Sequence, residues 1–421
     1  MYKRTTLKNG LRIITVPEKT AKAATVLVVV GAGSKYETKN LSGLSHFLEH
    51  MFFKGTRKLK KPKDVAEPLD RIGGDFNAFT GEEYTGYYAK VSAEHLDTAL
   101  AWVSDIFLNS RIPLKEIEKE RGVIIEELHM YSDNPRMYIG QLWKEVLYGD
   151  QPAGWDIGGR KETVAKIKRQ DILDYISSQY TSENTVVAVA GKIKEGEVIK
   201  KVSDIFSKIK EGKAESKLKV KDRGKGPRVL IHKRKTQQTN LALGVKAYDL
   251  FHKDRFAASL LAIALGGMMS SRMFIEVREK LGAAYFIRTF NESDTDSGWL
   301  CTFSGVDNAK LEKVIQTIVR EYGKMAKTRI SEKELKKAKD YLKGKMVLGL
   351  ESSDDKASFF GIQELLRKEI MTQEQIFAKI DKVTRSDIQR TAKNLFKTEN
   401  LNLALIGPFE DNKKFKKLLK L

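Results

Sequence analysis

The sequence contains an internal repeat, and this repeat constrains the fold more than any other feature. Residues 166–191 align without a gap on residues 382–407, an offset of 216 residues (382 minus 166). In both copies a helical pattern with an early Asp is followed by a Glu-Asn turn and an apolar strand closed by Gly. Identical residues that keep this register include Lys166/Lys382, Arg169/Arg385, Asp171/Asp387, Glu183/Glu399, Asn184/Asn400 and Gly191/Gly407. Since 216 residues are about half of the 421-residue chain, the sequence predicts two copies of one folding unit.

The repeat predicts an α+β fold. We expect two homologous α/β-sandwich domains in tandem, each a mostly antiparallel sheet packed by helices. Residues 25–30 and 84–91 have strand patterns, and residues 93–108 have a helical one. The expected boundaries are an N-terminal domain at 1–210, a linker at 211–228 and a C-terminal domain at 229–421. The linker is assigned there because residues 208–228 are polar and contain several Gly.

Composition excludes several classes of protein. With 41% hydrophobic and 31% charged residues, the chain is too apolar for a disordered protein and too polar for a membrane protein. The N-terminus has no apolar signal core, so we expect a cytoplasmic protein. The net charge is +21, but the Lys residues are scattered and no nucleic-acid-recognition motif accompanies them, so we expect no nucleic acid and no membrane as partners. Cys301 lies in an alternating strand pattern and is predicted to be a small core residue.

A short motif in the first half carries the chemistry. His46, Glu49 and His50 form an H-x-x-E-H sequence on a predicted helix, and at 3.6 residues per turn all three project from one face. Two imidazoles one turn apart can both reach a tetrahedral Zn²⁺ ion, while the carboxylate is placed to take a proton from the metal-bound water. The motif therefore predicts metal-assisted hydrolysis of a carbonyl compound.

A zinc site needs a third protein ligand, and the helical pattern of residues 113–129 offers several. Glu120 and Glu127 are seven residues apart on one face. Glu126 is rotated from Glu127 by about 100°, and His129 points almost opposite. Because most Glu residues on helices are solvated, spacing alone does not select a ligand from this set.

The two motifs together resemble the inverted-zincin signature of the pitrilysin family, which includes insulysin and mitochondrial processing peptidase. In that family the third ligand is the second Glu of a pair seven residues apart, 76 or 77 residues beyond the second His. Glu127 lies 77 residues beyond His50 (127 minus 50). The resemblance therefore implies that His46, His50 and Glu127 bind zinc, and that Glu126 and His129 do not.

The resemblance also assigns the remaining roles at the metal. It implies that Glu49 is the general base and that Glu120 orients a ligand His. Residues 260–269 replace the ligand helix in the second copy and lack metal-binding side chains, so we expect one Zn²⁺ per chain.

Two further stretches match the family. One implies an edge strand that pairs with an extended peptide substrate. Its residues are Asn77, Ala78, Phe79 and Thr80. The other is an Arg and Tyr pair seven residues apart in the second half, Arg278 and Tyr285, which would hold the peptide carbonyl and stabilise the developing oxyanion. Residues 150–159 depart from the family pattern. This departure puts the fine substrate preference in doubt, but it does not put the chemistry in doubt.

Relatives of this length pair two chains, so the resemblance implies a homodimeric clamshell, or a heterodimer with a related chain. Arg278 and Tyr285 then act either within their own chain or from the partner. We expect a zinc-dependent endopeptidase that hydrolyses short or unfolded peptides inside an enclosed cavity. The alternative is a non-catalytic structural or regulatory subunit of a processing-peptidase-like complex. A third hypothesis, a basic nucleic-acid-binding protein, predicts steep salt-dependent retention of DNA or RNA.

Overall fold

The structure is a computed structural model that describes residues 2–224, 226–367 and 369–421. Met1, Lys225 and Lys368, which fall in the predicted segments 1–210, 211–228 and 229–421, lie outside the described residues. The chain divides into two compact units. Unit 1 comprises Met1–Leu128, Asp156–Leu218 and Val347–Met371, and unit 2 comprises His129–Trp155, Lys219–Met346 and Thr372–Leu421.

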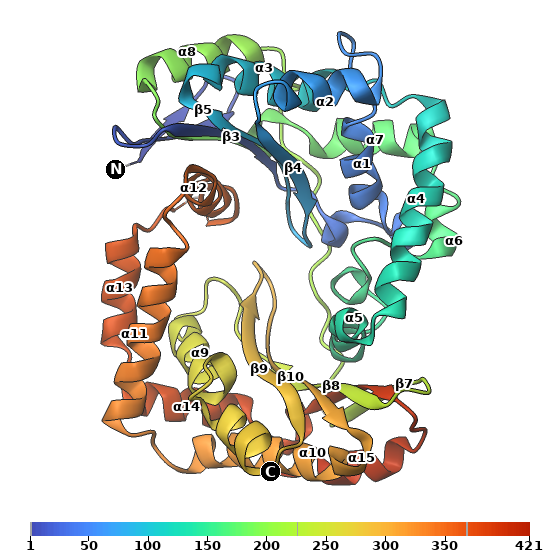
Figure 1. Ribbon diagram of the computed structural model, residues 1–421, viewed down its shortest axis with the longest axis vertical. Helices are drawn as coiled ribbons and strands as arrows, with labels where there is room; N and C mark the ends of the chain where they lie inside the picture. Colours follow the sequence, from blue (N-terminus) through green and yellow to red (C-terminus); the bar gives the residue numbers. More distant parts are fainter. Residues whose placement is uncertain (1, 225, 368) are drawn as a thin grey trace. The chain divides into compact units, whose positions relative to one another are not determined.

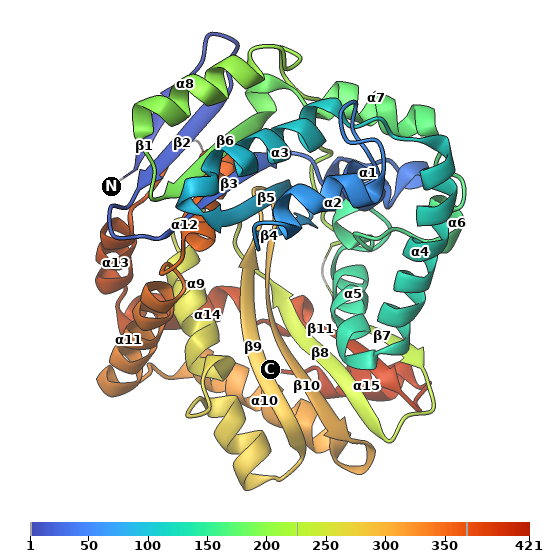
Figure 2. The ribbon, with the colours of Figure 1, turned by 45° about the horizontal axis from the view of Figure 1, so that its top comes forward.

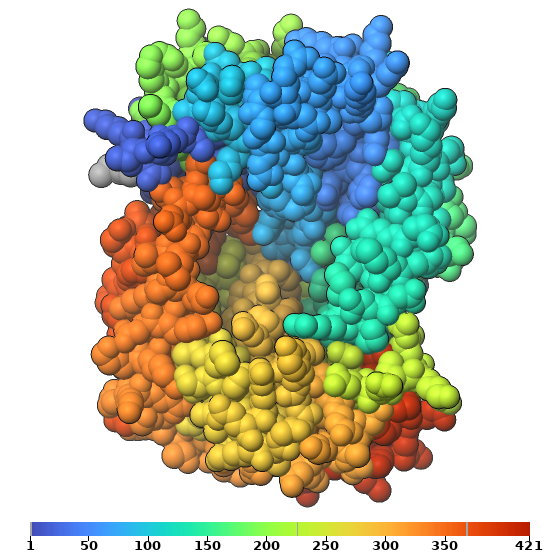
Figure 3. Space-filling model, viewed as in Figure 1, coloured from blue at the N-terminus to red at the C-terminus, as the bar shows by residue number. Residues whose placement is uncertain are grey.

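Unit 1 is built on a six-stranded sheet of order β1-β2-β6-β3-β5-β4, of which β3, β4 and β5 are labelled in Figure 1. The strands are β1 (Lys3–Thr6), β2 (Arg12–Pro17), β3 (Ala23–Val30), β4 (Asp75–Thr80), β5 (Thr85–Ser92) and β6 (Thr185–Gly191). All neighbouring pairs are antiparallel except β2 and β6. The helices are α1 (Leu44–Phe52), α2 (Pro62–Asp70), α3 (Leu96–Asn109), α6 (Lys161–Val164), α7 (Arg169–Gln179), α8 (Glu195–Phe206) and α12 (Ser353–Arg367), with most of α4 (Leu114–Asp133). The helix α2, in which four of the nine residues are exposed, forms part of the surface in Figure 3.

The central strand β3 explains why helices cover both faces of this sheet. Its sequence, Ala-Ala-Thr-Val-Leu-Val-Val-Val, is almost continuously apolar, and a strand of that kind is stable only when both faces are buried. Val26, Val28 and Val30 pack into the core that contains α1 and α3. Leu27 and Val29 point to the opposite face, where they pack against α12.

Unit 2 repeats this arrangement with a five-stranded sheet of order β7-β11-β8-β10-β9 (Figure 2). The strands are β7 (Arg228–Lys233), β8 (Gln238–Lys246), β9 (Ala284–Ser293), β10 (Gly298–Asp307) and β11 (Asn402–Gly407). The helices are α5 (Pro135–Tyr148), α9 (Arg255–Ala262), α10 (Leu311–Lys327), α13 (Gln373–Lys382), α14 (Arg385–Leu395) and α15 (Asn412–Leu418), with most of α11 (Glu332–Leu348), and two π-helical segments at Ile263–Gly267 and Phe274–Lys280. Its order matches β2-β6-β3-β5-β4 of unit 1, including the parallel end pair. The predicted α+β fold with two homologous sheets packed by helices is confirmed.

Each half of the chain contributes one helix to the other unit. The predicted domains, which were the continuous segments 1–210 and 229–421, did not include this exchange. Helix α5 comes from the first half of the chain but packs on β8 and β11 of unit 2. Helix α12 comes from the second half but packs on β3 and β6 of unit 1. The physical reason is that each sheet has a second apolar face. Trp143 of α5, for example, lies in one buried cluster with Ala242, Cys301 and Ala404.

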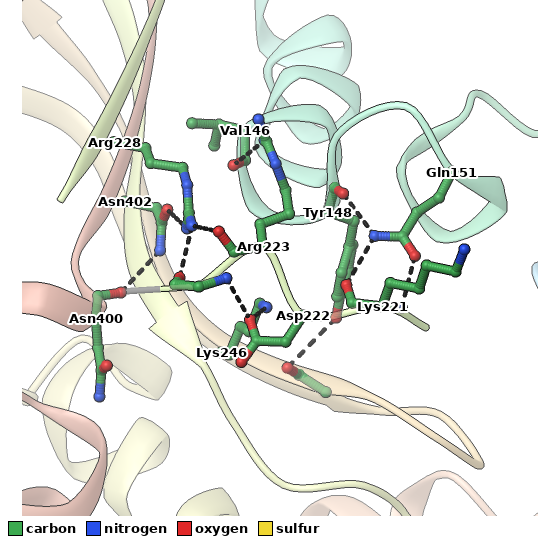
Figure 4. A network of polar contacts seen from close by, with 12 residues as sticks. Val146, Tyr148, Gln151, Lys221, Asp222, Arg223, Arg228, Lys246, Asn400 and Asn402 are labelled. Atoms are coloured by element: carbon green, nitrogen blue, oxygen red, sulfur yellow. Dashed lines mark hydrogen bonds and ion pairs between the residues drawn. The ribbon is translucent and has the colours of Figure 1, made fainter. Parts of the chain in front are cut away.

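The predicted linker 211–228 is divided between the units, and its second part is tied to unit 2 (Figure 4). Arg223 donates to the carbonyl oxygen of Val146 at 3.1 Å, and Lys246 donates to Asp222. The backbone N–H of Lys221 donates to the side-chain oxygen of Gln151 at 2.8 Å. These polar residues therefore hold the second part of the segment on unit 2, whereas the sequence analysis had assigned the whole segment as a linker between the domains.

The prediction for Cys301 concerns its burial. Cys301 is buried, and burial raises the pKa of its thiol well above the ordinary value, as expected for a core residue. Among the described residues, no helix combines the length and apolar character needed to cross a membrane.

Candidate metal centre

Helix α1 presents the H-x-x-E-H side chains away from the core. Its residues Leu44, Phe47 and Leu48 are buried in the core of unit 1, which leaves the other face for the motif. The helix begins after Gly43, which adopts a φ of 97°. Both oxygens of the buried Glu37 carboxylate accept backbone N–H groups at this end, from Gly43 at 2.7 Å and Ser45 at 2.6 Å. These hydrogen bonds satisfy backbone N–H groups that have no partner within the helix.

Three side chains from α1 and α4 converge. The Nε2 atoms of His46 and His50 lie 3.6 and 3.5 Å from Oε2 of Glu127. Among the described residues this is the one group of three or more His, Cys, Asp or Glu whose donor atoms approach closely enough for a metal, all within 4.8 Å of one another. Zinc–ligand bonds of about 2.1 Å in a tetrahedron place ligand atoms roughly 3.4 Å apart. Two nitrogens and a carboxylate oxygen at these separations fit Zn²⁺.

Glu120 contacts Nδ1, the other ring nitrogen of His50. Its Oε2 accepts a hydrogen bond from Nδ1 of His50 at 3.1 Å, and its Oε1 pairs with the ammonium of Lys54 at 2.7 Å. Proton donation from Nδ1 leaves the Nε2 lone pair of His50 directed toward Glu127 and His46. The part played by Lys54 was not predicted, because a lysine four residues after a ligand His has no motif of its own.

Glu49 faces a residue from the sheet edge. Thr80, at the end of β4, donates its hydroxyl proton to Oε2 of Glu49 at 2.5 Å. Burial raises the pKa of Glu49, and the hydrogen bond from Thr80 acts in the opposite direction. The sequence placed Thr80 on a substrate strand but gave no sign that it touches Glu49.

The two histidines differ in their protonation. Burial, together with repulsion from His50, lowers the pKa of His46 to about 4, so its imidazole is neutral at pH 7. Burial also acts to lower the pKa of His50, but hydrogen bonds to Glu120 and Glu127 outweigh it and raise that pKa to about 9. A metal ion at these ligands would replace this proton, because binding requires neutral imidazole.

Gly158, in the segment 150–159 where the sequence departs from the family pattern, lies near His46. A Cβ atom added at Gly158 would meet Leu128 at 2.9 Å and Nδ1 of His46 at 3.8 Å. Nδ1 of His46 is buried and makes no hydrogen bond with any described residue. The departure from the family pattern was expected to affect substrate preference alone. In the structure one of its residues, Gly158, also lies near His46.

The predicted substrate strand is β4, which among the described residues pairs with β5 alone and is therefore an edge strand. Asn77 is exposed, Ala78 is buried, and Phe79 and Thr80 are half-buried. The outer side of this strand is the side to which an added strand would pair, and there the backbone N–H of Ala78 already donates to Oδ1 of Asn77 at 2.9 Å.

Arg278 and Tyr285 lie next to each other in unit 2. The guanidinium carbon of Arg278 is 5.3 Å from the ring centroid of Tyr285 and 4.8 Å from that of Phe274. Tyr285 is 75% exposed, which is unusual for a residue that serves packing. Their role toward the metal-binding residues stays a prediction. The excluded candidates Glu126 and His129 are both exposed.

Comparison with known proteins gives consistent matches along the chain. A sequence model described as insulinase (peptidase family M16) matches residues 12–157, and one described as the peptidase M16 inactive domain matches residues 166–342. The zinc protease YmxG of Bacillus subtilis is 37% identical, with 97% of this chain and 98% of that protein covered. A zinc protease of Mycobacterium leprae is 34% identical over 99% of this chain and 94% of that protein.

Solved structures agree. A protease from Helicobacter pylori superposes with a TM-score of 0.89 at 27% identity, covering 97% of this chain and 99% of that one. A peptidase M16 inactive domain from Pseudomonas fluorescens has the same TM-score at 17% identity, over 98% of this chain and 99% of that one, and supports the fold alone.

Proposed function

The chain belongs to peptidase family M16, the insulinase family, and on this basis we propose that it is a zinc-dependent endopeptidase acting on short or unfolded peptides. The observation that carries the proposal is the convergence of His46, His50 and Glu127, with Glu49 on the same helix face. Relatives named zinc proteases support the metal and the class of reaction.

His46, His50 and Glu127 would hold the ion. When bound there, zinc supplies Lewis acidity that polarises the scissile carbonyl and lowers the pKa of a water molecule. Glu49 then acts as general base and accepts the proton of the attacking water. The hydrogen bond from Thr80 fixes the carboxylate of Glu49 in one rotamer, and Glu120 fixes the ring of His50.

The remaining roles concern the peptide. An extended substrate would add as a strand to the free edge of β4. Arg278 and Tyr285 would donate hydrogen bonds to the carbonyl oxygen as negative charge develops on it. In this proposal two chains form a dimer that encloses the substrate, so that flexible peptides enter and folded proteins do not.

The test is cleavage of a mixture of quenched-fluorescent peptides by the purified protein. We expect turnover that a zinc chelator abolishes and added Zn²⁺ restores. Glu49→Gln should keep the metal and lose turnover, whereas Glu127→Gln should lose both. Glu126→Gln, one residue away on the exposed side of α4, is the matched control and should behave as wild type.

Absence of turnover from a zinc-loaded dimer would contradict the proposal and favour the role of a non-catalytic subunit. The oligomeric state is measured in the same samples by light scattering, so that an inactive monomer is recognised as such.

A further inference from the structure

A groove lies over the edge of the sheet in unit 2, and none of the proposed metal ligands lines it. Helix α5 packs on the face of the sheet formed by β7, β8 and β11, and a cavity lies where this face continues over β9 and β10. The cavity between the start of α5 and this face has a volume of about 370 Å³, within the range of ligand-binding pockets. Its apolar lining comprises Met137, Gly140, Phe286, Phe290, Trp299 and Phe303.

The strand register explains why these side chains share one face. Phe303 of β10 lies directly opposite Arg288 of β9, and Trp299 lies opposite Glu292. Side chains of residues that pair directly across an antiparallel ladder point to the same side of the sheet. Phe286, Arg288 and Phe290, two residues apart in turn, therefore stand in a row along the groove.

Large apolar side chains remain exposed in this groove. Phe290 is 44% exposed and Met137 is 49% exposed, although a buried cluster lies beside them. The Phe290 ring packs edge-on against Phe303, with 6.0 Å between the ring centroids. Exposed apolar residues gathered in one concave patch are typical of a binding surface, whereas single exposed ones are not.

Two arginines give the groove a positive charge. The guanidinium of Arg136 lies over the ring of Phe286, 4.5 Å from its centroid, and Arg288 is exposed on the strand. Neither makes an ion pair with any residue in the described parts of the chain. Glu292, at the end of the same row, carries the opposite charge but has interactions of its own. An arginine held on an aromatic ring with no anion beside it is suited to an incoming carboxylate.

We propose that this groove binds a segment of the peptide substrate in which an apolar side chain is followed by an acidic residue. The apolar side chain occupies the space between Phe290, Phe303 and Met137, and the carboxylate pairs with Arg288 or Arg136. This assignment rests on the proposed peptidase function, because it takes its ligand to be a substrate peptide. It makes the groove a determinant of which peptides the enzyme retains.

The experiment measures binding without turnover. Fluorescein-labelled ten-residue peptides that contain Phe-Asp, Ser-Asp or Phe-Lys at their centre are titrated with the zinc-loaded Glu49→Gln protein, and anisotropy gives the Kd. We expect the Phe-Asp peptide to bind at least tenfold more tightly than the other two. Adding Phe290→Ser should remove the preference for Phe, and adding Arg288→Glu should reverse the charge preference so that Phe-Lys binds best.

Two matched controls lie on unit 2 outside the groove. Phe251 is exposed at 55%, and Arg329 is exposed without an ion pair to a described residue. Phe251→Ser and Arg329→Glu should leave all three Kd values unchanged. Equal affinity for the three peptides, or equal losses in groove and control variants, would overturn the proposal. Cleavage of generic peptides by the wild type is measured separately, so a failure of the peptidase function is distinguished from a failure of this groove.

Discussion

At the scale of single residues, the metal centre depends on contacts made by the side chains around the ligands. His50 is held by Glu120, which is held in turn by Lys54. Glu49 is held by Thr80. The H-x-x-E-H motif indicated His46, His50 and Glu49 as candidates because they are close in sequence, and the family resemblance implied Glu127. The contacts of Lys54 and Thr80 could not be predicted, because they join elements that only the tertiary fold brings together.

Replacing Glu120 should weaken the metal site without unfolding the protein. Glu120→Gln keeps an oxygen that can accept from His50 but loses the negative charge that Lys54 and His50 share. We expect zinc affinity to fall about 10- to 100-fold, as for other groups that orient a ligand. Competition with a chromogenic chelator measures the affinity. Glu118→Gln, on the exposed side of the same helix, serves as control, and an equal loss there would contradict the assignment.

Replacing Thr80 should affect turnover and not the metal. Thr80→Val preserves shape but removes the hydrogen bond to Glu49, so the carboxylate is no longer fixed in one orientation. We expect kcat to fall by about tenfold with unchanged zinc content, less than the roughly 100-fold or more that general base catalysis contributes, because Glu49 itself remains in place. Thr80→Ser should restore most of the activity. A change in KM alone would assign Thr80 to substrate binding instead.

At the scale of elements, the turn between β4 and β5 is anchored by a buried ion cluster. Glu83 accepts from Lys35 at 3.2 Å and also pairs with Lys217 from the segment that was predicted as linker. Lys35 and Glu83 are only 1% and 3% exposed. This cluster fixes the turn that follows Thr80, and therefore the strand end that touches Glu49.

Removing the carboxylate of this cluster should destabilise unit 1. Glu83→Gln removes the carboxylate that Lys35 and Lys217 share in a buried site. The free energy of unfolding should fall by about 3 to 5 kcal/mol, as when one partner of a buried ion pair is removed. Urea unfolding followed by circular dichroism measures it. Glu94→Gln, an exposed carboxylate of the same unit, should change the value by less than about 0.5 kcal/mol.

The start of α1 gives a pH-dependent contribution to stability. Burial raises the pKa of Glu37 to about 7, although the N–H groups of Ser45 and Gly43 act against the shift. The folded state therefore holds a proton that the unfolded state releases near pH 4.5, so this contribution declines as pH rises from about 4.5 to about 7 and is constant above.

Comparing two proteins isolates that contribution. In the zinc-free wild type the Glu37 contribution amounts to about 3 kcal/mol across this window, and Glu37→Gln should lack it. Urea unfolding at a series of pH values gives both curves, and their difference removes the titration of other groups. Parallel curves for the two proteins would contradict the assignment.

The predicted elements and the observed ones agree where the signal is local. The strand patterns at 25–30 and 84–91 correspond to β3 and β5, and the helical pattern at 93–108 to α3. The exchange of α5 and α12 could not be predicted, because an apolar helix face shows that a helix packs on a sheet but not on which sheet. The repeat made this ambiguity greater, since it supplies two similar sheets.

At the scale of the whole molecule, the proposal divides the chemistry between the two halves of the chain. The metal ligands and Glu49 belong to unit 1, and Arg278 and Tyr285 belong to unit 2. In the proposed dimer, we expect each site to take Arg278 from the partner chain.

Mixing two inactive variants tests this arrangement. Glu49→Gln and Arg278→Ala should each have little activity alone. After subunit exchange, half of the dimers are mixed. In a mixed dimer the site with an intact Glu49 receives an intact Arg278 from the partner, so activity should return to about a quarter of the wild-type value. If Arg278 acts within its own chain, every site of the mixed dimer lacks one group and no activity returns. Mass spectrometry of the intact dimers confirms that exchange has occurred, so a lack of recovery would exclude action from the partner chain.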